Sequence, residues 1–390
     1  MVLTNIHIID NIVGYNKNMK IAFIGQKGIP AQTGGVEKQV EELLVHLAAR
    51  GHSVYAYNRR GYAPEMKEFK GVKLISLPFI KGKNLEAISH VFLSIVHLAF
   101  HKFDIIHFQS IGPASLLWLV KIVKPRTPIV FTFHCQDYYH KKWSLFARLY
   151  LKFGEKIGCI LADQTLVTSK ELTSYALNRY NKGARYIASG INEPSLLAPD
   201  KIKEKWNLDK DSYILLASRL VRHKGIHYFI EAFKKIKTNK KLVIAGGSAH
   251  TDDYVNELHD LARDDDRIIF TGNQIGHNLQ ELYSNAYIFG QPSEYEGLSM
   301  GLLEAMSYAL PCLVSDIPSN KEALNGFGYT FKNQDIEDLY NKLSDLLLMD
   351  SKDLKTMGQS LKERTRKEYN WDLIVDETIG LYNQLFKKNK

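Results

Sequence analysis

The chain has 390 residues, more than one compact core usually holds, because single hydrophobic cores stop growing near ~250–300 residues. We therefore expect two domains. With 45% hydrophobic and 24% charged residues, 21 Tyr and 18 Phe, the composition excludes a disordered chain, a collagen and a disulfide-stapled mini-protein. The three cysteines (Cys135, Cys159 and Cys312) are too far apart for a metal-ligand spacing or a disulfide framework, which fits a reducing cytosol.

The net charge of +9 is unevenly distributed along the chain. Residues 1–195 hold 25 Lys and Arg against 13 Asp and Glu, a balance of +12, whereas the remainder holds 26 against 29, a balance of −3. The positive excess therefore belongs to the N-terminal half. Nucleic acid, an anionic membrane surface and a phosphorylated substrate are the partners that such a half attracts.

The sequence contains no run of ~18 uninterrupted apolar residues, so we expect no transmembrane helix. The most apolar stretch, residues 85–100, is interrupted by His90 and His97, which favours a buried helix. Residues 1–18 do not resemble a signal peptide, because Asp10 interrupts the apolar run and no basic region precedes it. Met19 directly precedes a strand and is a candidate start, which would make residues 1–18 an N-terminal extension.

Short β-rich runs alternate with longer amphipathic ones through the first half. Helix 35–50, for example, has apolar residues at spacings of three and four. We expect strands at 20–25, 53–57, 72–77, 104–108, 129–133 and 164–167. We expect helices at 35–50, 85–101, 113–123, 143–161 and 170–178.

A second alternating series follows residue 195. Its expected strands are 213–217, 241–245, 267–271, 287–290 and 312–314, and its expected helices are 226–236, 253–263, 278–284 and 299–308, with helices dominating after 335. Alternating βα units predict parallel sheets with helices on both faces, so we expect an α/β protein of two doubly wound, Rossmann-like domains. The proline-containing stretch 190–199 would join them. Ligands bind outside the carboxyl ends of such strands, so the natural site is the cleft that the two domains face.

Two loops at strand ends carry phosphate-binding chemistry. In the loop at 26–35, Gly34 and Gly35 let backbone N–H groups approach an anion at a helix start, but the loop is neither a Walker A loop nor G-x-G-x-x-G. A plain βα connection is the alternative. In the loop at 218–225, Arg219 and Lys224 flank a helix start at Gly225, where two cations would neutralise a diphosphate. A solvated basic loop is the alternative.

Two carboxylates eight residues apart form the third candidate. Glu296 precedes the helix at 299–308, and Glu304 lies in its second turn among apolar residues. An acidic residue before a helix can be a simple cap. A carboxylate among apolar side chains, however, needs hydrogen-bond donors, and ligand hydroxyls are suitable donors.

The N-terminal half adds a histidine and a basic helix. His134 follows the strand at 129–133, although a lone His is often structural. The helix at 143–161 and the loop before it interleave aromatic and aliphatic residues with cations, a pattern typical of a membrane-surface helix or of a half-buried helix with a basic solvent face. The cations in question are Lys141, Lys142, Arg148 and Lys152.

Together these pieces resemble the GT-B glycosyltransferases of the retaining family-4 type, over nearly the whole chain from Lys20. The main signature is the E-x7-E motif, EGLSMGLLEAM, from Glu296 through Glu304. ASRLVRHKGIHYFIEAF (217–233), LVIAGG (242–247) and GGVEK (34–38) match in order and spacing. KGIPAQTGGVE and HCQDYYHKKW look most like bacterial rhamnosyltransferase-like enzymes of surface-polysaccharide synthesis.

The resemblance implies that residues 193–370 bind a nucleotide-sugar, that 19–192 bind the acceptor and that the helix at 371–390 packs back on the first domain. Arg219 and Lys224 would hold the diphosphate, Glu304 the ribose hydroxyls and Glu296 the transferred sugar. Further donor contacts would come from Gly34, Gly35, Gly246, Gly297 and Leu298, and His134 would lie near the reacting centre. The chain departs from the family at 188–191, where Ala-Ser-Gly-Ile lacks the frequent Asn-Gly turn.

The implied reaction is transfer of a hexose or deoxyhexose from a UDP-, dTDP- or GDP-sugar, with retention of configuration and without a bound metal or cofactor. A polyprenyl-diphosphate-linked saccharide at the cytoplasmic face of the plasma membrane fits the +12 balance, with Lys141, Lys142, Arg148 and Lys152 facing the acceptor or the membrane. The sequence leaves open another GT-B enzyme, such as an epimerase or a phosphorylase. A nucleic-acid-binding protein is disfavoured, because no aromatic-basic recognition motif accompanies the charge.

Overall fold

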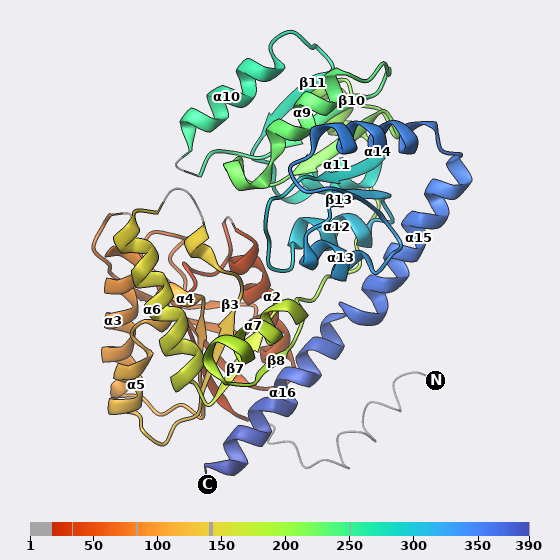
Figure 1. Ribbon diagram of the computed structural model, residues 1–390. Helices are drawn as coiled ribbons and strands as arrows, with labels where there is room; N and C mark the ends of the chain where they lie inside the picture. Colours follow the sequence, from red (N-terminus) through yellow and green to blue (C-terminus); the bar gives the residue numbers. More distant parts are fainter. Residues whose placement is uncertain (1–17, 33, 83–84, 140–142, 250, 390) are drawn as a thin grey trace, which may run out of the picture. The chain divides into compact units, whose positions relative to one another are not determined.

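The computed structural model describes residues 18–389 apart from 33, 83–84, 140–142 and 250 (Figure 1). The chain divides into two compact units. Unit 1 consists of Met1–Ala188 with Trp371–Lys390, and unit 2 of Ser189–Asn370, so unit 2 begins four residues before the expected boundary at 193. The predicted α/β fold of two Rossmann-like domains is confirmed.

Unit 1 is built on an eight-stranded sheet with the order β3-β4-β2-β1-β5-β6-β7-β8. All neighbours are parallel except β3 and β4, and β5 and β6 are buried along their whole length, as strands covered on both faces are. The strands are β1 (Lys20–Ile24), β2 (Ser53–Arg59), β3 (Glu68–Phe69), β4 (Val72–Leu77), β5 (Ile105–Gln109), β6 (Ile129–Phe133), β7 (Gln164–Val167) and β8 (Ala184–Tyr186).

The helices of unit 1 follow the expected ranges with one correction. The single helix expected at 113–123 is two helices separated by a turn at 115–116, where the Ser115 hydroxyl donates to the carbonyl oxygen of Gly112 (2.7 Å). The helices are α2 (Gly35–Ala49), α3 (Leu85–Ala99), α4 (Ile111–Ala114), α5 (Leu117–Val123), α6 (Leu145–Leu161), α7 (Lys170–Tyr180) and α16 (Trp371–Lys388), with a 3-10 turn η1 (Asp137–Tyr139).

Helix α16 belongs to unit 1 although it follows unit 2 in sequence. It packs on α2, where Arg50 pairs with Asp372 and Asp376 and the Trp371 ring stacks on His46. Deeper in the unit, the Tyr382 hydroxyl lies 2.6 Å from Nδ1 of the fully buried His107 on β5. The last helix therefore completes the hydrophobic core of the first unit.

Unit 2 contains a six-stranded, fully parallel sheet with the order β11-β10-β9-β12-β13-β14. Its strands are β9 (Tyr213–Ala217), β10 (Lys241–Ala245), β11 (Ile268–Gly272), β12 (Ile288–Gln291), β13 (Cys312–Ser315) and β14 (Tyr329–Phe331). Its helices are α8 (Asp200–Trp206), α9 (Ile226–Lys234), α10 (Asp252–Ala262), α11 (Gly276–Asn285), α12 (Met300–Ser307), α13 (Pro318–Leu324), α14 (Ile336–Leu348) and α15 (Ser351–Glu368), with a 3-10 turn η2 (Arg222–Lys224).

Each sheet has one point at which the strand order reverses. In unit 1 the chain first moves outward from β1 through β2 to β4 and then returns to β5 on the other side of β1. In unit 2 it moves from β9 through β10 to β11 and returns to β12 on the other side of β9. Doubly wound sheets bind ligands at this switch point, beyond the carboxyl ends of the two diverging strands.

Candidate functional site

The switch point of unit 2 holds the predicted basic and acidic loops together. Arg219 comes two residues after β9, and the loop that carries Glu296 follows β12, the neighbour of β9 in the sheet. Lys224 ends η2, which connects β9 to α9. The parallel pairing of β9 and β12 therefore brings residues more than seventy positions apart in sequence to one edge of the sheet.

Lys224 and Glu296 form an ion pair within this edge. The Lys224 ammonium donates a hydrogen bond to Oε1 of Glu296, and the Ser293 hydroxyl donates to the same oxygen (2.8 Å). The two charged side chains are only 14% and 13% exposed, so their attraction is screened less than that of a surface pair. Sequence reasoning gave the two residues separate roles and did not predict that they contact each other.

Two glycines allow the loops to approach this closely. A Cβ on Gly225, whose φ is +66°, would overlap the carbonyl oxygen of Pro292, and the Glu294 N–H donates to the His223 carbonyl oxygen (2.7 Å). A Cβ on Gly246 would overlap the carbonyl oxygen of Ser218, directly before Arg219. The absence of a side chain at Gly246 thus lets the backbone at the end of β10 pack closely against the segment that carries Arg219.

A buried polar network lies beneath the Glu296 loop, and sequence reasoning missed it. Asn320, fully buried on α13, accepts a hydrogen bond from the Gln291 amide (2.9 Å) and donates to the carbonyl oxygen of Ser315 (3.0 Å). The Ser315 hydroxyl in turn donates to the carbonyl oxygen of Ser293, whose own hydroxyl holds Glu296. The only sequence signal is polar residues at the ends of β12 and β13.

Replacing Asn320 with alanine is expected to destabilise unit 2 by about 2 kcal/mol, because the buried side-chain amide N–H of Gln291 and the buried carbonyl oxygen of Ser315 each lose a hydrogen bond. Turnover should fall as well, because the loop that holds Glu296 loses its support. Urea unfolding and a transfer assay measure the two effects. Asn256→Ala, an exposed substitution on α10, is the matched control and should change neither. An Asn320→Ala variant with native stability and turnover would contradict a supporting role for the network.

Among the other cations of the edge, Arg219 is exposed and Arg222 is engaged elsewhere. The Arg219 guanidinium has no side-chain partner within the described part of the chain and is available to a ligand. Arg222 pairs with Glu257 and lies over the Tyr254 ring, 4.9 Å from its centroid. Arg219 and Lys224 are thus the two cations of this edge that are placed to contact a ligand.

The start of α12 presents backbone donors beside the ion pair. The Ser299 side chain caps the helix by accepting from the Leu302 N–H, and Ser299 also donates to the Gln291 amide oxygen (2.6 Å). The N–H groups of Gly297 and Leu298 have no hydrogen-bond acceptor among the described residues. Free N–H groups next to a helix N-terminus favour an anionic ligand.

Glu304 is half-buried in the second turn of α12, beside two tyrosines. Its carboxylate is a hydrogen-bond partner of the fully buried Tyr283 hydroxyl, and burial together with this negative charge raises the pKa of Tyr283 well above its usual value. Burial and the same carboxylate raise the pKa of Tyr308 to about 12. The protein therefore supplies a hydrogen-bond donor, the Tyr283 hydroxyl, to this carboxylate.

In unit 1 the carboxyl ends of adjacent strands hold His134 in one orientation. Its Nε2 lies 2.8 Å from Oε1 of Gln109 at the end of β5, and Thr168, after β7, donates to its carbonyl oxygen (3.2 Å). Burial lowers the pKa of His134 to about 4, so the ring is neutral at pH 7. Because an amide oxygen only accepts, Nε2 carries the proton and Nδ1 is left as an acceptor. Sequence reasoning missed Gln109, which could have been found as a polar residue at a strand end.

The loop after β1 is tightly braced. Asn58 accepts from the Ile29 N–H (3.1 Å) and donates to its carbonyl oxygen (2.6 Å), and Gly34 has the positive φ of +97° that glycine tolerates. Gly35 begins α2. The Glu37 carboxylate packs against Gly34, so an acidic side chain already lies at this helix start.

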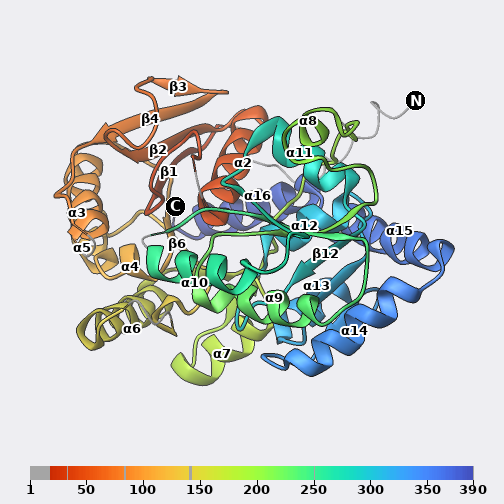
Figure 2. The ribbon, with the colours of Figure 1, turned by 90° about the horizontal axis from the view of Figure 1, so that it is seen from above.

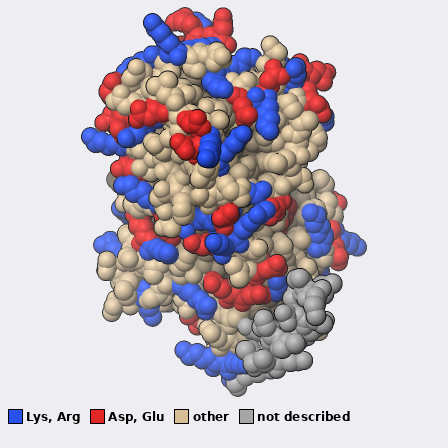
Figure 3. All heavy atoms as spheres, turned by 90° about the vertical axis from the view of Figure 1, so that its right-hand side faces the viewer, with Lys and Arg blue, Asp and Glu red and all other residues tan. Residues whose placement is uncertain are grey.

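The predicted basic residues of the acceptor side divide into two groups. Lys141 and Lys142 lie outside the described residues. Arg148 is half-buried on α6 and its Nε has no hydrogen-bond partner in the described chain, while the exposed Lys152 places its ammonium 5.2 Å from the Tyr138 ring centroid. On the face that Figure 3 shows, Lys and Arg side chains lie among Asp and Glu side chains.

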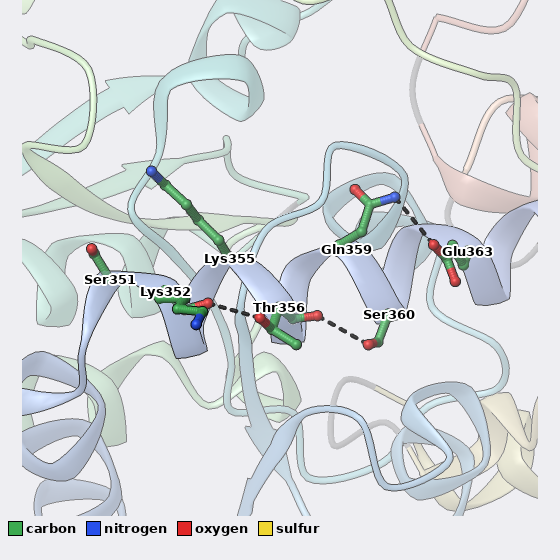
Figure 4. A pocket seen from close by; sticks show the side chains of 7 residues that line it. All are labelled: Ser351, Lys352, Lys355, Thr356, Gln359, Ser360 and Glu363. Atoms are coloured by element: carbon green, nitrogen blue, oxygen red, sulfur yellow. Dashed lines mark hydrogen bonds between the residues drawn. The ribbon is translucent and has the colours of Figure 1, made fainter.

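One pocket runs along α15 and contains none of the predicted site residues. Figure 4 shows that its lining side chains all come from this one helix, where the Gln359 amide donates to Glu363 (3.4 Å). An open polar groove on a single helix lacks the convergent groups of a binding site. The switch point of unit 2 is therefore the stronger candidate.

Comparison with known families decides between the classes of enzyme that the sequence left open. Residues 33–193 match the family Glycosyltransferase Family 4, and residues 199–367 match Glycosyl transferases group 1. The chain is a GT-B glycosyltransferase of the family-4 type. The rhamnosyltransferase-like subgroup has no such support and stays a prediction.

Relatives of this glycosyltransferase differ in how much of the chain they cover. An uncharacterized glycosyltransferase of Methanocaldococcus jannaschii is 27% identical over 398 residues, which cover 93% of this chain and 98% of that protein. The N,N'-diacetylbacillosaminyl-diphospho-undecaprenol alpha-1,3-N-acetylgalactosaminyltransferase of Campylobacter jejuni is 27% identical over 190 residues, less than half of either chain. The crystal structure of Anabaena HepE with UDP and glucose has the same fold, with a TM-score of 0.78 at 16% identity, covering 94% of this chain and 100% of that one.

Proposed function

We propose that the protein transfers a hexose or deoxyhexose from a nucleotide-diphosphate sugar to a saccharide, with retention of configuration. The observation that carries the proposal is the Lys224–Glu296 pair at the switch point of unit 2, with Arg219 and Glu304 on the same sheet edge. The two cations suit a diphosphate and the two carboxylates suit sugar hydroxyls. The UDP in the similarly folded HepE structure supports a nucleotide donor.

The pair suggests how the leaving group is stabilised. When the sugar departs, negative charge develops on the diphosphate, and Lys224, Arg219 and the N–H groups of Gly297 and Leu298 would receive it without a metal ion. Lys224 would exchange its hydrogen bond with Glu296 for one with a phosphate oxygen. Glu296 would then accept from the transferred sugar while Ser293 continues to hold it.

A retaining reaction by this site does not need Glu296 as a covalent nucleophile. A carboxylate that a serine hydroxyl holds and that accepts a hydrogen bond from the transferred sugar is a weak nucleophile and a good orienting group. We propose that the acceptor hydroxyl gives its proton to the leaving phosphate. The neutral His134, with Nδ1 as an acceptor, suits a hydrogen bond from a sugar hydroxyl.

We propose a polyprenyl-diphosphate-linked saccharide of surface-polysaccharide synthesis as the acceptor, bound by unit 1 at the cytoplasmic face of the plasma membrane. The +12 balance of the N-terminal half supports this, and so does the C. jejuni relative, whose name contains a diphospho-undecaprenol-linked sugar. The described part of the chain has no helix with the length and apolarity to cross a bilayer. Lys141, Lys142, Arg148 and Lys152 are the proposed contacts.

The donor assignment predicts nucleotide-dependent thermal stabilisation. One of UDP, dTDP, GDP or ADP at ~100 times its Kd should stabilise the protein by about 2.7 kcal/mol. Glu304→Ala should weaken the binding of that nucleotide by roughly 10–100-fold, because a hydrogen bond to a charged group contributes about 1.5–3 kcal/mol. Thermal unfolding with and without each nucleotide measures both.

Glu204→Ala, an exposed carboxylate on α8, is the matched control and should bind the nucleotide like the wild type. If no nucleotide stabilises the protein, or if Glu304→Ala responds like Glu204→Ala, the donor site is assigned wrongly. If the protein instead converts the nucleotide-sugar to its epimer in the absence of an acceptor, its activity is that of an epimerase and not of a transferase.

A further inference from the structure

Exposed apolar side chains gather on unit 1. Sixteen of the twenty large hydrophobic side chains that are exposed among the described residues belong to unit 1, and eleven of these lie on or directly after α3, α5 and α6. These helices pack side by side, as Figures 1 and 2 both show. We define the α3–α5–α6 surface by six of these residues: Phe92, Phe100, Ile122, Leu145, Phe146 and Leu149.

Two of these helices carry exposed apolar side chains on their outer faces in addition to the apolar residues on their inner faces. On α3 the inward residues include Val91 and Ile95, while Phe92, Val96 and Phe100 recur every four residues on the outside. On α6 the inner face uses Gly154 and Gly158 to pack closely, and Leu145, Phe146 and Leu149 point outward. A surface helix normally has one apolar stripe, so a second exposed stripe indicates a further partner.

The charge around this surface selects the partner. Residues 80–161, which span the three helices, contain 11 Lys and Arg but only 4 Asp and Glu. Lys152 and Lys156 are exposed on α6 itself, beside the apolar residues. A second copy of the chain would bring two such positive surfaces together, which repulsion opposes, whereas an anionic bilayer satisfies both the apolar and the basic side chains.

We propose that the α3–α5–α6 surface docks into an anionic membrane, with Phe100 and Phe146 entering the acyl boundary and the lysines remaining at the headgroups. The inference rests on the proposed function, because a lipid-linked acceptor is what brings this enzyme to a bilayer. It differs from binding by the basic residues alone. Apolar insertion resists salt, while the attraction of Lys152 and Lys156 to headgroups is screened.

Flotation of the full chain with vesicles tests the proposal. Vesicles of phosphatidylcholine with about one quarter phosphatidylglycerol are compared at about 0.1 M and about 1 M NaCl. We expect binding at low salt and a reduced but measurable fraction at high salt. Phe100→Ser with Phe146→Ser should lower the partition coefficient on the order of 10–100-fold at both salt concentrations. Lys152→Glu with Lys156→Glu should lower it only at low salt.

Leu348→Ser is the matched control, because Leu348 is 87% exposed but lies in unit 2, and it should float like the wild type. Nucleotide-dependent thermal stabilisation should be unchanged in every surface variant, which separates this proposal from the donor site. The proposal is overturned if the phenylalanine variant floats like the wild type or if high salt abolishes wild-type binding completely. A wild-type dimer, seen by light scattering, that this variant dissociates without a change in flotation would instead make the surface a self-interface.

Discussion

Lys224→Ala should lower turnover on the order of 10²–10³-fold, the usual effect of removing one preorganised group that stabilises a developing negative charge. Without Lys224 the departing diphosphate has one cation fewer to stabilise its charge. Glu296 remains largely buried, and Ser293 is then its one hydrogen-bond partner among the described residues. Nucleotide binding should weaken less than turnover falls, because charge on the diphosphate grows as the sugar departs. Transfer rates with the donor identified by thermal unfolding measure this effect.

The ion pair of Lys235 with Glu337 provides the control. It has the same charges as the Lys224–Glu296 pair, but the Lys235 side chain is 51% exposed and lies outside the site. Lys235→Ala should therefore retain wild-type turnover and stability. Lys224→Arg tests whether charge alone suffices at this position. Wild-type rates in folded Lys224→Ala protein would remove Lys224 from the proposed mechanism.

Gly246→Ala should disable the same edge by a steric route. The added Cβ would overlap the carbonyl oxygen of Ser218. Two backbone hydrogen bonds hold the two segments together on either side of this point. The Ser218 N–H donates to the Ala245 carbonyl oxygen (3.0 Å), and the Leu220 N–H donates to the Gly247 carbonyl oxygen (2.9 Å). The segment that carries Arg219 must therefore shift. We expect a loss of about 3 kcal/mol in stability, as for other severe steric changes, and loss of the nucleotide-dependent thermal stabilisation.

The neighbouring glycine is a matched control for this substitution. A Cβ on Gly247 would lie 3.2 Å from the Cβ of the Asn273 side chain, a tight contact that a small movement relieves. Gly247→Ala should therefore cost much less stability and keep nucleotide binding. Thermal unfolding of both variants with and without nucleotide distinguishes them. If the two variants have the same stability and the same nucleotide-dependent stabilisation, the predicted overlap at Gly246 does not disturb the site.

Several strands were predictable to the residue because each is a short run of strand-forming residues between turn residues. The expected ranges 72–77, 129–133, 213–217 and 241–245 coincide with β4, β6, β9 and β10. The three-residue strands β8 and β14 and the two-residue β3 were missed, since so short a run has no periodicity and is defined only by its hydrogen-bonded neighbour. The break between α4 and α5 was missed because apolar spacing continues across it.

Sequence also located the residues that carry the proposed chemistry. Arg219, Lys224 and Glu296 lie in loops between a strand and a helix, and such positions can be read from alternating βα units, while Glu304 was found as a carboxylate among apolar residues in the following helix. The supporting groups were not readable. Asn320 and Gln109 are ordinary amides in the sequence, and only their contacts with Gln291 and His134 connect them with the site.

By itself, the sequence determined the fold class, the two Rossmann-like units and the composition of the loops at the switch points, because hydrophobic periodicity and turn residues are local properties of the chain. The tertiary structure decided which distant residues meet. The Lys224–Glu296 pair, the network around Asn320 and the neutral state of His134 depend on strand order and burial. The α3–α5–α6 surface was also decided there, because an apolar residue in a helix has the same sequence signature whether it faces the core or the solvent.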